Sequence, residues 1–112
     1  MGYSININKK QLIEDYKLNW VNGYEFDNII KYIQMAAEKV NHDGLNWQLT
    51  AVNEGLQWLY LEDLDKATLV NLNDELNKLF HEFREQVRSE GIELLFKEML
   101  TLLTLSIREK NN

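Results

Sequence analysis

The chain has 112 residues, of which 45% are hydrophobic and 27% charged, and its formal net charge is −6. This length suits one domain with one continuous core, and the composition is that of a globular rather than a disordered protein. Cysteine is absent, which excludes disulfides, thiolate metal ligands and a thiol nucleophile. The negative charge argues against direct binding of nucleic acid, because a phosphate backbone is bound by basic surfaces.

The chain contains no proline and only five glycines, which favours long helices over short strands and tight turns. We therefore predict a mainly α fold: a compact four- to five-helix bundle in a single domain over residues 1–112, with a short N-terminal strand as an option. The first residues lack a basic region followed by an apolar run, so no secretion signal is indicated and we expect a cytoplasmic protein.

Residues 3–8 alternate apolar and polar side chains, the period of a half-buried strand. Asn8 then resembles a helix N-cap, with Gln11 placed three residues later to complete a capping box. This pattern predicts a helix over residues 9–21, ended by a left-handed cap at Gly23.

The next helix is predicted over residues 24–41, and Asp43 is placed to cap the element that follows. Residues 45–61 are ambiguous. The spacing of Leu45, Leu49, Val52, Leu56 and Leu59 favours a helix, but the same stretch also alternates and contains a turn sequence at Asn53-Glu54-Gly55. The alternative is an α+β fold with a small hairpin at 45–61, to which residues 3–7 add a third strand.

The C-terminal part, residues 66–110, is predicted to form two amphipathic helices separated near Ser89. The first has a narrow apolar seam that includes Leu69, Leu72, Leu76, Leu79, Phe83 and Val87. The second, from Ile92 onward, is apolar on a wider stripe that includes Leu94, Leu100 and Leu105. It is either central in the bundle or contacts another molecule, for example in a homodimer. Its uncharged run of nine residues, 99–107, is shorter than the roughly 20 needed to span a membrane.

Residues with catalytic or metal-binding chemistry are scattered. His42 and His81 are the two histidines, and although His81 and Glu85 are one helical turn apart, no zinc-binding motif surrounds them. No serine lies in a nucleophile motif, and no glycine-rich phosphate loop is present. We therefore expect no enzymatic activity, no metal and no cofactor.

The segment 41–65 is the most distinctive, because it contains five acidic residues and no lysine or arginine. It also contains Trp47, Trp58 and Tyr60. Large aromatic residues are highly buried on average, which favours core positions for the two tryptophans. In an interface, however, aromatics anchor a partner and unpaired carboxylates steer a basic one. The predicted partner-binding residues are Glu54, Trp58, Tyr60, Glu62, Asp63 and Asp65.

These observations lead to two hypotheses about function. The first is a non-catalytic protein-binding module, an acidic inhibitor, antitoxin or immunity-type protein that neutralises a basic protein partner such as a nuclease toxin. The second is a small structural or phage-encoded assembly protein that oligomerises through its C-terminal helix. The first is an analogy at the level of protein class, since small acidic helical proteins often act by occlusion.

Overall fold

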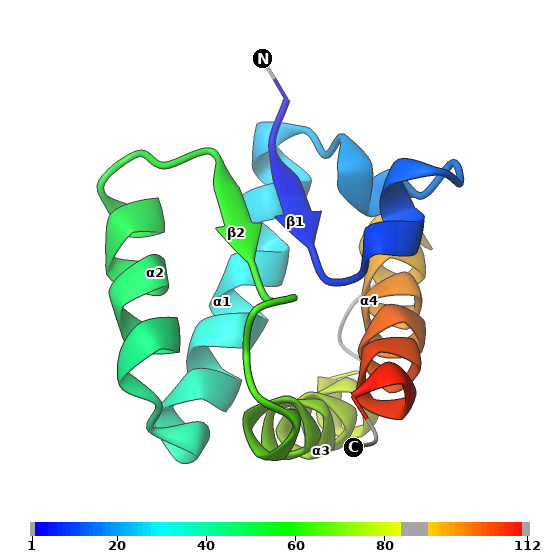
Figure 1. Cartoon of the computed structure of the whole chain (residues 1–112). Helices are drawn as coiled ribbons and strands as arrows, with labels where there is room; N and C mark the ends of the chain where they lie inside the picture. The colour runs from blue at the N-terminus through cyan, green and yellow to red at the C-terminus, as the bar shows by residue number, and fades with distance from the viewer. Residues whose placement is uncertain (1, 84–89, 111–112) are drawn as a thin grey trace.

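The computed structural model describes residues 2–83 and 90–110, and within them the fold is mainly helical (Figure 1). Four α-helices surround a small sheet of two parallel strands, which confirms the predicted fold class. The elements in chain order are β1 (Ser4–Asn6), the 3-10 helices η1 (Lys9–Leu12) and η2 (Lys17–Asn19), α1 (Gly23–Val40), α2 (Asp43–Asn53), β2 (Trp58–Tyr60), α3 (Lys66–Phe83) and α4 (Glu90–Glu109).

The helix α1 is the centre of the core and contacts α2, α3 and α4, while α3 also contacts α4. Asn22 caps its start by accepting a hydrogen bond from the Glu25 N–H at 2.8 Å. The predicted left-handed cap at Gly23 is therefore wrong, and the left-handed residue is Asn41, with φ of 54° at the other end of α1. The buried stripe of α1 consists of Phe26, Ile29, Ile30, Ile33, Ala36 and Ala37.

The helices α3 and α4 were correctly predicted from their apolar spacing. Leu69, Leu72 and Leu76 of α3 are fully buried and Leu79 packs against the core. The side chain of Phe83, together with Val87 and the predicted helix end at Ser89, lies outside the described residues. In Figure 1, α3 is seen nearly end-on and lies across the lower ends of α1 and α4.

The predicted helix over residues 9–21 is replaced by the two short turns η1 and η2. The capping box of Asn8 and Gln11 is present, but the side chain of Asn19 donates to the carbonyls of Gln11 and Glu14. Those bonds occupy carbonyl groups that an α-helix would use for its own backbone. The turn η2 is instead fixed by α4, because the Glu98 carboxylate accepts from the N–H groups of residues 17 and 18.

Residues 45–61 form neither a continuous helix nor a hairpin. The helix α2 ends at Asn53 and Gly55 follows with φ of 114°, a conformation that glycine adopts without strain. The last part of this segment becomes β2, which pairs in parallel with β1 in the register Ser4–Trp58, Ile5–Leu59 and Asn6–Tyr60. Parallel strands need a long connection, and α1 and α2 provide it here. His42, rather than the predicted Asp43, caps α2 through its ring nitrogen.

Candidate protein-binding surface

The two strands bury one face of the sheet and expose the other. Leu59 of β2 is fully buried, whereas its neighbours Trp58 and Tyr60 are 49% and 42% exposed. Side chains alternate between the two faces of a strand, so both aromatic rings lie on the side away from the core. They line a shallow groove together with Ser4 and Asn6 of β1. We call these four residues, Ser4, Asn6, Trp58 and Tyr60, the outer face.

Both edges of this small sheet are covered. At the β1 edge, Tyr3 and Val21 exchange backbone hydrogen bonds of 2.8 and 2.7 Å. Farther along the same edge, the buried amide of Gln11 bonds to the backbone of residues 5 and 7. At the β2 edge, the Tyr60 N–H donates to Gln48 Oε1 of α2 at 2.8 Å. Because other segments of the chain bond to both edges, the outer face is the candidate binding surface of the sheet.

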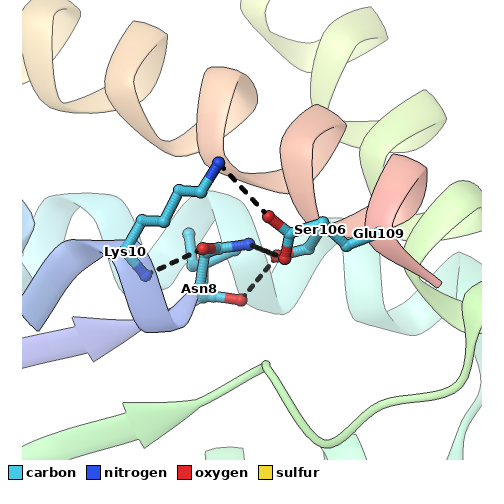
Figure 2. A network of polar contacts seen from close by, with 5 residues as sticks. Asn8, Lys10, Ser106 and Glu109 are labelled. Atoms are coloured by element: carbon cyan, nitrogen blue, oxygen red, sulfur yellow. Dashed lines mark hydrogen bonds and ion pairs between the residues drawn. The ribbon is translucent and has the colours of Figure 1, made fainter.

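A partly buried polar network holds the residues that follow β1 against α4 (Figure 2). Asn8 Nδ2 donates to Ser106 Oγ at 2.9 Å and to Glu109 Oε2 at 3.0 Å. The Ser106 hydroxyl donates in turn to the Ile7 carbonyl at 2.7 Å. Lys10 lies 3.7 Å from the other carboxylate oxygen of Glu109 and completes the network. Ser106 therefore has a structural role. The strand β1 is held by β2 along its length, and the residues after it are held by α4.

All three tryptophans of the chain are exposed, and the expectation that Trp47 and Trp58 are core residues is wrong. Trp47 is 72% exposed on α2, and Trp20, between η2 and Val21, is 76% exposed. Trp20 was missed from the sequence because residues 9–21 were assigned to a helix. Its ring lies against Gly2, 18 residues earlier in the chain, so a local pattern gives no signal for it.

The predicted acidic residues lie in different local environments. Glu54 and Asp63 are exposed near the two ends of β2, and within the described part of the chain neither side chain forms an ion pair. Glu62 is half-buried, and Glu62 and Asp63 line a polar pocket together with Lys9 and Lys110. The acidic segment is thus partly balanced by lysines from the two ends of the chain.

Asp65 has a local structural role at the start of α3. Its carboxylate accepts a hydrogen bond from the Thr68 hydroxyl, and it lies 3.8 Å from His42 Nε2. The pKa of Asp65 is lowered below its usual 3.8, first by that hydroxyl and then by the backbone N–H of Thr68 and the nearby histidine. These contacts are those of a helix cap, and they direct the carboxylate toward its own chain.

The leucines predicted for oligomerisation are buried to different degrees. Leu94 is exposed, Leu100 packs against the core and Leu105 is half-buried. Most of the wide apolar stripe of α4 is therefore covered by α1, α3 and η2, which all contact it.

Among the residues that the structure describes, no three His, Asp or Glu side chains gather closely enough to hold a metal ion. Glu85, the predicted neighbour of His81, lies outside those residues. No helix within residues 2–83 and 90–110 combines the length and apolar character that crossing a membrane requires.

Comparisons with known protein families, with curated proteins and with solved structures find no match to this chain. Function is therefore inferred from the chemistry of the surface alone.

Proposed function

We propose that the protein is a non-catalytic binding module that occludes a basic protein partner, as an inhibitor, antitoxin or immunity-type protein does. The observation that supports this is the outer face, where Trp58 and Tyr60 stand exposed side by side on one strand. Each ring leaves somewhat less than half of its surface in water, so it lacks roughly half of the ~1.5–3 kcal/mol that full burial of a large apolar side chain provides. A partner that covers them recovers it, and tryptophan and tyrosine are the residues that most often dominate interfaces.

The electrostatics favour a basic partner. The net charge of −6 attracts cations from a distance, and Glu54 and Asp63 place exposed carboxylates near the two ends of β2. Such charges raise association rates, and their effect weakens as salt screens them. Asp65 contributes to the same negative field, although Thr68 and His42 engage its carboxylate.

The test uses tagged full-length protein expressed in its source cells, in three forms: the natural chain, a Trp58→Ala/Tyr60→Ala double variant and a Trp47→Ala control. Trp47 serves as the control because it is also an exposed indole, but lies on α2 and not on the outer face. We expect a basic protein to be captured by the natural chain and by the control, and to be lost with the double variant. The product of a neighbouring gene is the first partner to assay with purified components.

Purified partner then allows the charges to be tested separately. Reversal of Glu54 and Asp63 to lysine should slow association by roughly tenfold at low salt, with a smaller effect at high salt. Equal capture by the double variant and the control, or a captured partner that is acidic, would refute the proposed function.

A further inference from the structure

His42 lies between the starts of two helices. It is the residue before α2, and its ring nitrogen Nδ1 accepts a hydrogen bond of 3.2 Å from the N–H of Leu45 in the first turn. The other ring nitrogen, Nε2, lies 3.8 Å from a carboxylate oxygen of Asp65, the residue before α3. In Figure 1, the turn between α1 and α2 lies at the lower end of the molecule, as does α3. One imidazole therefore interacts with the N-terminal ends of both helices.

The backbone around His42 fixes the position of its ring. Asn41, the residue before it, is left-handed with φ of 54°, which ends α1 and turns the chain toward α2. Gly44 lies beside the ring, since a Cβ atom added to it would be 3.1 Å from Cε1 and 3.4 Å from Nδ1 of His42. The imidazole therefore packs against the first turn of α2 while Nδ1 caps that turn.

This cap depends on the charge of the ring. A ring nitrogen accepts a hydrogen bond only when it carries no hydrogen of its own, so the cap requires a neutral His42 with its hydrogen on Nε2. When the ring is protonated, the Nδ1–H group faces the N–H of Leu45, and two donors cannot bond to each other. The positive charge also lies at the N-terminal end of α2, where the helix dipole is itself positive. Protonation of His42 therefore removes the cap.

The charged groups around His42 favour the protonated ring at the other helix. Asp65 forms the ion pair with it at the start of α3. The charged residues nearest in the chain to His42 and Asp65 are Asp43, Lys39 and Lys66, all exposed, where salt screens their effect. An exposed ion pair and an N-cap each stabilise by a small and similar amount. Protonation thus exchanges the bond to α2 for a stronger attraction to Asp65, with little change in overall stability.

We propose that His42 is a pH-sensitive switch, which caps α2 when neutral and releases the first turn of α2 when protonated. This inference does not depend on the proposed function. The switch reaches the sheet through Gln48, which lies three residues after Leu45 and accepts a hydrogen bond of 2.8 Å from the Tyr60 N–H. That bond covers the edge of β2, so release of the first turn of α2 weakens the cover in acid.

The switch is tested by NMR of the full chain at about pH 8 and about pH 5, between which histidine changes its charge. At the higher pH, the nitrogen chemical shifts of His42 should show a hydrogen on Nε2 and none on Nδ1. The protection of the Leu45 N–H against solvent exchange, relative to the intrinsic rate at each pH, should be roughly fivefold lower in acid, which is the effect of losing one N-cap. The protection of the Tyr60 N–H should fall by less, because Gln48 lies farther along α2.

Two variants separate the switch from a general effect of acid. Asparagine is a good N-cap that does not titrate, so His42→Asn should keep the Leu45 N–H equally protected at both pH values. His81→Asn is the matched control, because it makes the same substitution at the other histidine of the chain. It should respond to acid as the natural chain does. Circular dichroism at both pH values checks that each variant is folded.

A hydrogen on Nδ1 of His42 at about pH 8 would overturn the switch, because the ring would then be a donor even when neutral. Unchanged protection of Leu45 in acid would also overturn it, as would an equal loss of protection in the His42→Asn variant. A loss at Leu45 with none at Tyr60 would overturn the link to the sheet. The proposed function is judged separately, by capture of a basic partner at neutral pH.

Discussion

Replacement of Gln11 by methionine is expected to destabilise the protein strongly, although Gln11 lies in no long element. Its buried amide oxygen accepts hydrogen bonds from the N–H groups of Ile7 at 2.6 Å and of Asn8 at 2.9 Å. Its amide nitrogen donates to the Ile5 carbonyl at 2.8 Å. Methionine keeps the length and volume of the side chain but satisfies none of these groups.

The magnitude follows from the three backbone groups left without partners. Ile5 and Ile7 are fully buried and Asn8 nearly so, which leaves little access for water. An unsatisfied buried polar group costs about 1–3 kcal/mol, so the three together predict a loss of about 3–6 kcal/mol after partial relaxation. A domain of this kind has a free energy of unfolding of roughly 5–15 kcal/mol, so the variant should be marginally folded at best.

Urea unfolding followed by circular dichroism measures this loss, with Gln34→Met as the matched control. Gln34 is a partly exposed glutamine whose amide makes one side-chain hydrogen bond, to Asn53, so its replacement should cost no more than about 0.5 kcal/mol. Similar unfolding midpoints for the two variants would show that Gln11 does not support the sheet as described.

Four further outcomes are expected. Tryptophan emission of the folded protein should lie close to that of the urea-unfolded chain, since all three indoles are exposed; a large shift on unfolding would contradict this. Lys110→Met should lower the free energy of unfolding by about 1–3 kcal/mol, because its ammonium donates to the carbonyls of Glu62 at 2.6 Å and Leu64 at 2.5 Å. Asp65→Asn should lower the melting temperature at neutral pH, and it should make the melting temperature less sensitive to a fall in pH. The lowered pKa means that the carboxylate stabilises the fold fully above about pH 4, and that this contribution is lost as the pH falls through the folded-state pKa, below 3.8. If the melting temperature of the variant fell with pH as steeply as that of the natural protein, the capping role of Asp65 would be contradicted. Light scattering should show a monomer at micromolar concentration, because Leu94 is the one exposed large apolar residue of α4; a dimer dissociated by Leu94→Asp would favour assembly through α4.

The long helices were predictable because their signal is local. The helices α1, α3 and α4 each repeat apolar residues at helical spacing over at least four turns, and each buries that stripe in the core. The two failures, at residues 9–21 and 45–61, have a common cause. Both segments are shaped by contacts with distant parts of the chain, namely Glu98 of α4 for η2 and strand β1 for β2. Strands of three residues are too short for their own pattern to show such partners.

The aromatic part of the surface was predictable in part. Trp58 and Tyr60 were selected as partner-binding residues from the segment in which they occur, and both are exposed on one face. The side chains of Trp58 and Tyr60 face outward because Leu59, which lies between them, faces the core. Leu59 is positioned in turn by the pairing of β2 with β1, where its register partner is Ile5. Trp20 precedes the Tyr3–Val21 bridge and its ring lies against Gly2, so its exposed position could not be assigned without the fold.

Under the proposed function, charge and aromatic side chains act at two different steps of binding, although the sequence places both in one segment. The acids of residues 41–65 do not form a single patch, because Asp65 caps α3 and Glu62 lies beside Lys9 and Lys110. What remains is a long-range field of net charge −6, which acts before contact and is screened by salt. In the proposed complex the exposed aromatic side chains would act only after contact, when water is expelled from their faces. Charge variants should therefore change the association rate in a salt-dependent way, whereas tryptophan variants should change the dissociation rate at any salt concentration.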